Sequence, residues 1–250
     1  MREDVPTRRA AVIQGMFGRI APRYDLLNRL LSLGLDQGWR RTLAARLERA
    51  AVGQVLDVCT GTGDLAEACA ERTTTLGCDF SLPMLVSARA KLRGRVALFA
   101  ADSLRLPIAE GALDAVTVAF GVRNFESLGQ GLAELARVLR PGGIVMVLEF
   151  SRPRGWLGPL LRWWMDNGPP ALGRLLSNDG QAYVYLSASV RAFPSAERLS
   201  YLLEEAGLVA VTAVPLSGGV VMLYQGTKPA SEPTAVHCGG GRRQHPGGGD

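Results

Sequence analysis

Four aspartates stand where the sequence most readily supports chemistry. Asp57 and Asp64 flank a loop with glycines at 61 and 63, and Asp79 and Asp102 each follow a short apolar run. Glycines let the backbone approach a ligand closely, and a carboxylate that ends the next strand can hold both ribose hydroxyls of an adenosine. A purely structural tight turn would show the same glycines. With their context, these positions predict a cofactor site made by Asp57, Gly61, Gly63, Asp79 and Asp102.

The charge at the loop favours a cationic cofactor. A pyrophosphate needs a helix N-terminus without competing negative charge, whereas Asp64 occupies that terminus here. Asp64 as a simple helix N-cap is the alternative interpretation. A dehydrogenase with a Tyr-x-x-x-Lys pair is disfavoured, because neither Lys91 nor Lys228 has a tyrosine four residues earlier. The aspartates therefore predict a cleft for a sulfonium without phosphates, as in S-adenosylmethionine, and hence methyl transfer.

Histidine and cysteine usage narrows the chemistry further. The only histidines are His237 and His245, near the C-terminus. A Ser-His-Asp triad, a histidine metal site and a histidine general base are therefore not expected in the folded part. The four cysteines show no CxxC-type spacing, so no metal site is expected.

The elements that position these residues alternate between strands and helices. Near-continuous apolar runs are typical of strands buried on both faces of a parallel sheet. Helical patterns begin near Asp64, Ser81 and Leu128, and the third is expected to end at Arg140-Pro141-Gly142-Gly143. This alternation predicts a doubly wound α/β fold. The five runs are Val55–Val58, Thr75–Cys78, Val96–Ala100, Leu113–Phe120 and Ile144–Phe150.

After Phe150 the pattern changes. Residues 151–194 are predicted to be an inserted helical cap, followed by a helix over Ser195–Ala206. The runs Leu208–Leu216 and Val220–Gly226 flank Ser217-Gly218-Gly219, which indicates an antiparallel hairpin. A mostly parallel sheet that ends in such a hairpin is typical of class I methyltransferases. We predict one methyltransferase domain over residues 1–228 and a disordered, glycine-rich tail over 229–250.

Composition sets the expected location. The chain has 250 residues, which suits one domain. It contains no run of five like charges, so no nucleic-acid partner is expected. The polar start, Met1 to Arg9, and the lack of about 18 consecutive apolar residues predict a cytoplasmic protein. The sequence leaves the oligomeric state open.

Several segments resemble the C-methyltransferases of ubiquinone and menaquinone biosynthesis, over about residues 12–228. The most specific are the opening signature, Met16–Asn28, and the Phe-Gly-x-Arg-Asn motif at 120–124. Further similar segments are Ser32-Leu33-Gly34, Trp39-Arg40, Arg137–Gly143, Leu148–Pro153, Ser177-Asn178-Asp179, Tyr183, Tyr185-Leu186, Ser189, Arg191 and Phe193-Pro194.

The resemblance implies contacts with S-adenosylmethionine, residue by residue. They fall on Thr62, Asp79, Asp102, Ser103 and Ala119, where only a backbone contact is expected at the alanine. The chain departs from the family pattern at Gly18, Asp36 and Tyr224, which puts substrate choice rather than chemistry in doubt.

The resemblance also implies a prenylated quinol as substrate. Methylation of a quinol carbon needs alignment with the methyl donor and loss of the ring proton. Arg123 is the candidate that stabilises a phenolate, with Tyr24 and Asp25 completing the site. An ion pair that pins the loop is the alternative for Arg123, and simple packing is the alternative for Tyr24.

Demethylmenaquinol is the favoured substrate, and a methoxybenzoquinol is the alternative. A binding module that has lost turnover is a third interpretation, disfavoured by the intact loop. The tryptophan-rich stretch Gly155–Trp164 fits either peripheral contact with the inner face of the cell membrane or packing of the cap.

Overall fold

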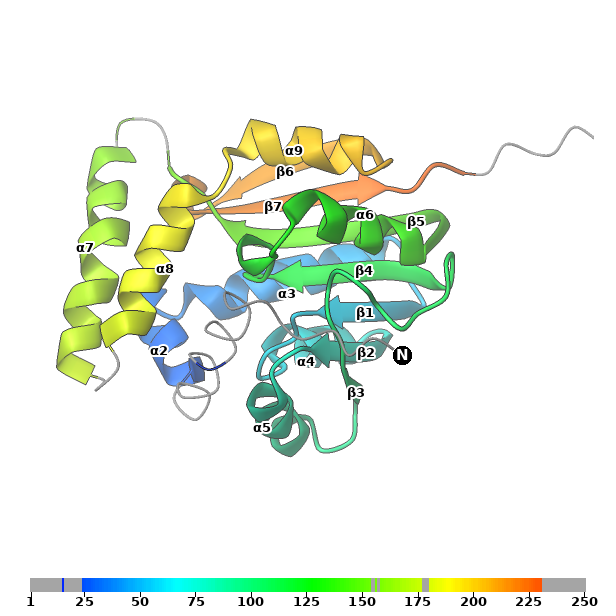
Figure 1. The fold of residues 1–250 in the computed structure, drawn as a ribbon, viewed down its shortest axis with the longest axis horizontal. Helices are drawn as coiled ribbons and strands as arrows, with labels where there is room; N and C mark the ends of the chain where they lie inside the picture. Colours follow the sequence, from blue (N-terminus) through cyan, green and yellow to red (C-terminus); the bar gives the residue numbers. More distant parts are fainter. Residues whose placement is uncertain (1–14, 16–23, 154–155, 157, 177–179, 231–250) are drawn as a thin grey trace, which may run out of the picture.

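One seven-stranded sheet, in the order β3-β2-β1-β4-β5-β7-β6, forms the centre of the computed structural model (Figure 1). The structure describes residues 15, 24–153, 156, 158–176 and 180–230. The first five strands run parallel, and β7 is antiparallel to both of its neighbours. The predicted doubly wound fold is confirmed. The strands are β1 (Gln54–Val58), β2 (Thr74–Asp79), β3 (Ala97–Ala100), β4 (Leu113–Ala119), β5 (Leu139–Phe150), β6 (Val209–Leu216) and β7 (Val221–Thr227).

Helices cover both faces of the sheet (Figure 1). Leu43 of α3 (Leu35–Arg49) and Leu65 of α4 (Asp64–Ala70) pack on one face. Leu132 of α6 (Leu128–Val138) and Leu199 of α9 (Ala196–Glu205) pack on the other. Helix α5 (Leu82–Leu92) packs against α4 and the sheet edge. Strands buried on both faces must be apolar throughout, which explains the uninterrupted runs.

The Pro-Gly-Gly turn corrects one boundary. Helix α6 ends at Val138, and Pro141-Gly142-Gly143 lies within β5 rather than between helix and strand. The Gly142 amide donates to the Lys228 carbonyl at 2.9 Å, and the Lys228 amide donates to the Gly143 carbonyl at 2.8 Å. These bonds to the chain after β7 hold the segment in the sheet.

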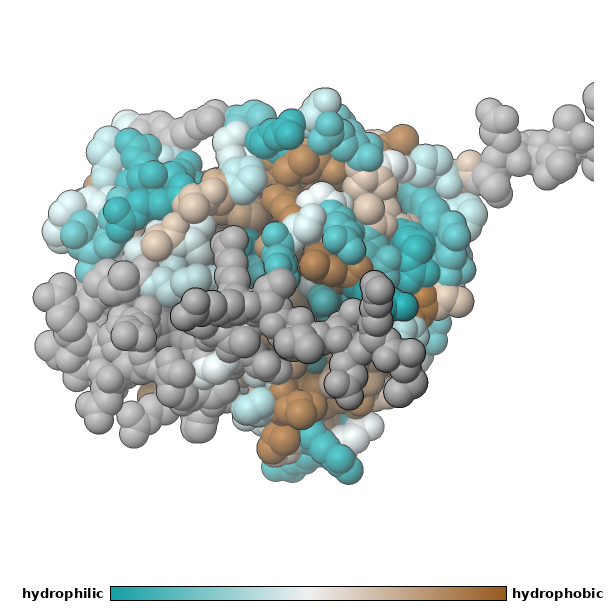
Figure 2. All heavy atoms as spheres, viewed as in Figure 1, coloured by the Kyte–Doolittle hydropathy of each residue, from teal (hydrophilic) through white to brown (hydrophobic). Residues whose placement is uncertain are grey.

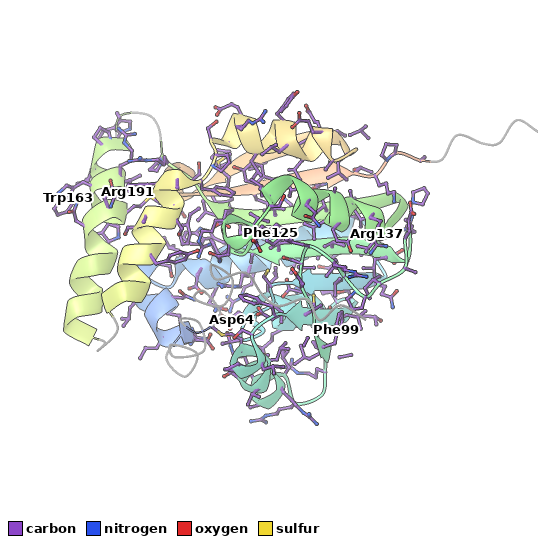
Figure 3. All side chains as sticks on the ribbon, viewed as in Figure 1. Asp64, Phe99, Phe125, Arg137, Trp163 and Arg191 are labelled. Carbon is purple, nitrogen blue, oxygen red and sulfur yellow. The ribbon has the colours of Figure 1, made fainter. Side chains whose placement is uncertain are left out.

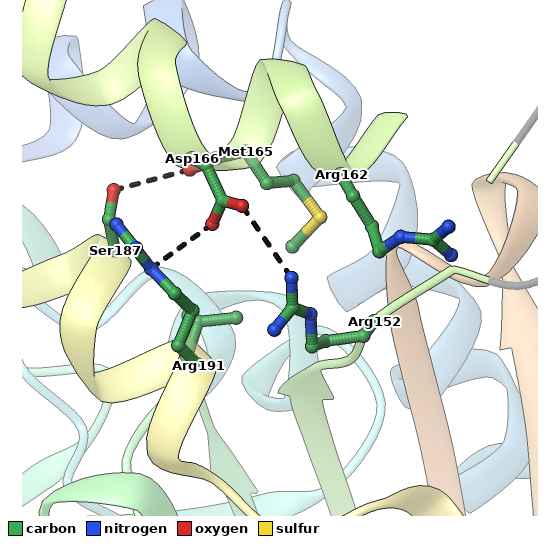
Figure 4. A pocket seen from close by; sticks show the side chains of 7 residues that line it. Arg152, Arg162, Met165, Asp166, Ser187 and Arg191 are labelled. Atoms are coloured by element: carbon green, nitrogen blue, oxygen red, sulfur yellow. Dashed lines mark hydrogen bonds and ion pairs between the residues drawn. The ribbon is translucent and has the colours of Figure 1, made fainter. Parts of the chain in front are cut away.

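Two helices of the predicted cap, α7 (Gly158–Leu176) and α8 (Gly180–Ala192), pack side by side at the C-terminal ends of the parallel strands (Figure 1). Asp166 of α7 lies 3.5 Å from Arg152, which follows β5, and 3.2 Å from Arg191 of α8 (Figure 4). These ion pairs tie the helical hairpin to the sheet. Ser177–Asp179 and the tail from residue 231 onward lie outside the described residues, so the predicted tail stays a prediction.

The C-terminal hairpin is confirmed. Residues Ser217–Gly219 form a short 3-10 turn, η3, between β6 and β7, with positive φ angles at Gly218 and Gly219. The Trp39 indole N–H donates to the Ser217 hydroxyl at 2.9 Å, which links this turn to α3. The surface in Figure 2 is mostly polar over α6, while hydrophobic side chains gather over α5, where Val86 is exposed. Within the described part of the chain, no helix is long and apolar enough to cross a membrane.

Candidate active site

The loop between β1 and α4 is held in a conformation that needs its glycines. Gly61 and Gly63 have φ angles of +57° and +88°, which L-residues with side chains adopt only with strain. A Cβ at Gly61 would meet no described atom within 4 Å, so no described side chain fills the space beside this glycine. A Cβ at Gly63 would come within 2.8 Å of Leu92, so this glycine also allows α5 to pack closely.

Asp79 closes the loop from the end of β2. Its carboxylate accepts the Gly61 amide at 2.9 Å and the Ser81 amide at 2.8 Å, and burial raises the pKa of Asp79. The Ser81 hydroxyl is fully buried and has no partner within the described structure. A carboxylate beside a glycine turn suits an adenosine cofactor, because it can accept hydrogen bonds from the ribose hydroxyls.

Asp57 lies beneath the loop instead of lining a cleft. Its side chain is buried, and its two oxygens accept the hydroxyls of Thr60 at 2.7 Å and Thr117 at 2.9 Å. Burial raises the pKa of Asp57 from its ordinary 3.8 to about 7. The described contacts of Asp57 therefore support the loop from below, and its predicted place in a cofactor cleft stays a prediction.

Asp64 is paired rather than free. Gly63 is the N-cap of α4, so Asp64 as the cap residue is wrong. Its carboxylate accepts the Lys91 ammonium at 2.5 Å and lies 4.0 Å from the Arg40 guanidinium. Asp64 therefore has two basic neighbours, and the expectation of an unpaired carboxylate that repels phosphate is corrected.

The remaining predicted cofactor residues lie at the same edge of the sheet. Ser103 follows β3 and is half-buried, and Ala119 ends β4 and is half-buried. Asp102 is exposed, and one of its oxygens accepts the Leu104 amide at 2.9 Å. Because β1 to β4 run parallel, their C-terminal ends bring these residues to the edge that carries the glycine loop.

Arg123 lies in a 3-10 turn, η2 (Val122–Asn124), and is buried in an ion pair. Its guanidinium is 6% exposed and donates to Glu149 at 2.8 Å and to the Phe120 carbonyl. The guanidinium also lies 5.6 Å from the centre of the Phe150 ring, and its buried Nε has no hydrogen-bond partner among the described residues. This ion pair is the arrangement expected if Arg123 pins the loop, which was the alternative interpretation.

Glu149 was missed by the sequence analysis. It is 0% exposed within β5. A carboxylate inside a buried apolar run is the signal that could have identified it, since a buried charge needs a partner.

Asp25 contacts the glycine loop between β1 and α4. Its carboxylate accepts the Thr62 hydroxyl at 2.5 Å and also binds the Lys91 ammonium. Asp25 belongs to α2 (Tyr24–Leu31), which Tyr24 begins, and the Tyr24 side chain lies outside the described residues. The described contacts of Asp25 are therefore with the loop and with Lys91 of α5. A role of Lys91 at this site was not predicted from the sequence.

The cap reaches the Arg-Asn motif through Tyr185. The Tyr185 hydroxyl of α8 donates to the Asn124 side chain at 2.9 Å. Gly121, at the start of the motif, allows another close approach, since a Cβ there would lie 2.6 Å from the Cβ of Cys59. The motif thus joins the glycine loop to the cap.

Of the three departures from the family pattern, Gly18 lies outside the described residues, and the structure describes Asp36 and Tyr224. Asp36 is buried and bonded to Arg40 at 2.7 Å, and Tyr224 is buried in the core. The effect of these departures on substrate choice stays a prediction.

Solved structures with this fold include methyltransferases. A S-adenosylmethionine-dependent methyltransferase from Thermotoga maritima matches with a TM-score of 0.61 and 18% identity, over 86% of this chain and 99% of that chain. The cyclase SpnF matches with a TM-score of 0.62 and 18% identity, over 90% and 97% of the two chains. The fold is therefore class I methyltransferase-like, although fold alone does not fix the reaction.

Comparisons of sequence are more specific. A demethylmenaquinone methyltransferase of Thermus thermophilus is 46% identical over 86% of this chain and 100% of the relative. A ubiquinone/menaquinone biosynthesis C-methyltransferase of Syntrophotalea carbinolica is 44% identical over 85% and 92%. The model of the ubiE/COQ5 methyltransferase family matches residues 5–228.

Fold, loop and sequence together define an S-adenosylmethionine-dependent methyltransferase. Within that class, the chain belongs to the ubiE/COQ5 methyltransferase family. The family named from the sequence is confirmed, and the dehydrogenase alternative is set aside.

Proposed function

We propose that this protein transfers the methyl group of S-adenosylmethionine to a ring carbon of demethylmenaquinol, which gives menaquinol. The similarity of nearly the whole chain to the demethylmenaquinone methyltransferase of Thermus thermophilus, at 46% identity, carries the proposal. A methoxybenzoquinol of ubiquinone biosynthesis is the second candidate, because the Syntrophotalea carbinolica relative bears the name of both pathways.

The residues at the sheet edge fit the proposed cofactor. Asp79, held against the Gly61 amide, would bind the ribose hydroxyls. Asp102 and Ser103, at the end of the neighbouring strand, would border the adenine. Thr62 would lie beside the amino-acid end. When bound, the cofactor supplies an electrophilic methyl group on a sulfonium.

In the proposed reaction, a bond forms between the ring carbon and the methyl carbon while the sulfur–methyl bond breaks. The ring carbon then loses its proton to a base. Arg123 would steady the negative charge on a quinol oxygen, since a guanidinium stays charged at any working pH. Its buried, unpartnered Nε supports this role, because an orphaned donor costs free energy unless a ligand uses it. Asp25, or a water held near it, would take the proton.

Product analysis tests the proposal. The purified chain is incubated with methyl-labelled cofactor and a short-chain demethylmenaquinol, and the labelled lipid is identified by mass spectrometry. Label on the ring carbon supports the proposal, whereas label on a quinol oxygen would show an O-methyltransferase. As a control for the activity assay, Arg49→Ala changes an exposed arginine at the end of α3 and should leave turnover unchanged.

We also propose that the protein works in the cytoplasm, on the inner face of the cell membrane where a prenylated substrate resides. Trp156 and Trp163 are 89% and 61% exposed. Trp163 projects from the side of α7 away from α8 (Figure 3). Leu160, one turn before Trp163 and Trp164, is exposed as well. Tryptophan side chains favour the membrane interface, which supports this orientation.

Vesicle binding tests the membrane contact. A Trp156→Ser/Trp163→Ser variant should bind anionic phosphatidylglycerol vesicles at least about tenfold more weakly, while methylating a short-chain quinol normally. Tyr201→Ser, at an exposed aromatic of α9, is the control and should bind as the unaltered protein does. Equal vesicle binding by all three proteins would contradict the proposed surface.

A further inference from the structure

Lys91 joins three elements at the cofactor loop. Its ammonium, on α5, donates to Asp64 of α4 at 2.5 Å and to Asp25 of α2, and lies 3.4 Å from the Thr62 hydroxyl. Burial lowers the pKa of Lys91, but its bonds to Asp25 and Asp64 outweigh burial and raise the pKa. Lys91 is therefore a charged group directly beside the glycine loop.

The charges around Lys91 do not balance. Lys91 faces Asp25 and Asp64, and behind them Arg40 is paired with Asp36 at 2.7 Å. Gln37, which bonds both Asp36 and Asp64, adds no charge. Among the residues that the structure describes, three carboxylates thus face two bases in this network, which leaves one net negative charge. Partly buried charge of this kind is costly unless it is compensated.

The proposed cofactor carries the missing charge. Its sulfonium and ammonium are positive and its carboxylate is negative, so one net positive charge remains. The carboxylate itself needs a cation as partner. Arg40 is 7% exposed, bonded to Asp36, and lies 5.3 Å from the Phe120 ring centre, so its guanidinium is engaged. The Lys91 side chain is 23% exposed and is the more accessible of the two bases in this network.

Composition gives an independent argument. Among 28 basic residues, lysine occurs only at positions 91 and 228, and all others are arginine. Lysine is therefore rare in this chain, and one of its two occurrences lies beside the glycine loop. A compact ammonium with three rotatable N–H groups can donate hydrogen bonds to oxygens in three directions, whereas a planar guanidinium favours one bidentate partner.

We propose that Lys91 binds the carboxylate of the amino-acid end of S-adenosylmethionine, with Asp64 facing the neighbouring ammonium. The inference rests on the proposed function for the presence of this cofactor. Lys91 would then give the site its specificity, because ligands with an amino-acid carboxylate would bind more tightly than a thioadenosine that lacks one.

Calorimetric binding to three ligands tests this role. S-Adenosylhomocysteine keeps the carboxylate and ammonium, decarboxylated S-adenosylmethionine keeps only the ammonium, and methylthioadenosine keeps neither. A Lys91→Met variant should bind S-adenosylhomocysteine about 10- to 100-fold more weakly, as expected for a lost charge-assisted hydrogen bond. Its affinity for the two ligands without a carboxylate should not fall.

Two further variants separate binding from support of the fold. Lys228→Met removes the other lysine and should leave all three affinities unchanged. Asp25→Asn loosens α2 but keeps Lys91, and should bind S-adenosylhomocysteine at least as tightly as the unaltered protein. If Lys91→Met and Asp25→Asn weaken all three ligands alike, Lys91 only anchors α2 and the inference is overturned. Unchanged affinity of Lys91→Met for S-adenosylhomocysteine would overturn it too.

The readout separates this inference from the proposed function. An unaltered protein that binds none of the three ligands would refute the proposed cofactor and the inference with it. An unaltered protein that binds S-adenosylhomocysteine but methylates neither quinol would refute only the proposed substrate. In that case the ratio of the affinities for S-adenosylhomocysteine and for the two ligands without a carboxylate still tests the role of Lys91.

Discussion

Replacing Arg123 by alanine should both destabilise the protein and remove its activity, and the two effects can be separated. Glu149 is 0% exposed, and the Arg123 guanidinium is its partner at 2.8 Å. Removing one member of a buried ion pair leaves an uncompensated charge, which costs about 3–5 kcal/mol. The Arg123→Ala variant should therefore lose about that much of its free energy of unfolding.

A second substitution distinguishes stability from chemistry. The double variant Arg123→Met/Glu149→Gln contains no buried charge at this position and keeps similar side-chain volume. Replacing a buried ion pair by uncharged groups is often neutral, so this variant should regain at least half of the lost stability. It should not regain turnover, because no guanidinium remains to stabilise the quinol oxygen. We expect a loss of turnover of about 100-fold or more, as for removal of an electrostatic stabiliser.

Urea unfolding gives the stabilities, and methyl transfer to a short-chain demethylmenaquinol gives the activities. Cofactor binding to the same variants should stay close to that of the unaltered protein. If the double variant recovers turnover together with stability, Arg123 only pins the loop, and catalysis must be assigned to Tyr24 and Asp25. If the free energy of unfolding of Arg123→Ala lies within about 0.5 kcal/mol of that of the unaltered protein, the buried ion pair does not stabilise the turn.

Three further outcomes follow from the loop. Asp79→Ala should weaken cofactor binding by about 1.5–3 kcal/mol, the value of charge-assisted bonds, and unchanged calorimetric affinity would remove Asp79 from the site. The raised pKa of Asp57 means that the folded state holds its proton more tightly than the unfolded state, so this residue lowers stability as pH rises from about 4 to 7. The interval from 3.8 to about 7 corresponds to at most about 4.5 kcal/mol, at about 1.4 kcal/mol per pKa unit. Asp57→Asn should flatten that dependence in unfolding measured at about pH 4 and pH 8, and an identical slope would contradict the burial argument. Gly121→Ala should cost about 1–3 kcal/mol through contact with Cys59, and an unchanged thermal midpoint would show that the loops can separate.

The sheet and its ligand edge could be predicted because their signals are local. A strand covered on both faces must be apolar at every position, and this is visible in Val55–Val58 and Leu113–Phe120. A parallel order then brings the strand ends, and with them Asp79 and Ala119, to one edge. The Pro-Gly-Gly turn was misplaced because its conformation depends on pairing with Lys228, which is distant in sequence.

The partners of the charged residues could not be predicted for the same reason. Lys91 meets an aspartate 66 residues earlier, and Arg123 meets a glutamate 26 residues later. Such pairs are set by how α2, α5 and β5 pack, and no local pattern encodes them. Asp57 shows the related difficulty that a carboxylate at a strand end can face a ligand or support the loop from below.

Competition between two quinols tests the proposed function most directly. The purified protein is given labelled S-adenosylmethionine with equal amounts of short-chain demethylmenaquinol and a methoxybenzoquinol, and kcat/KM is obtained for each. We predict C-methylation of both or of the naphthoquinol alone, with demethylmenaquinol the faster substrate. Faster methylation of the benzoquinol would contradict the favoured substrate, and no methylation of either ring would contradict the proposed function itself.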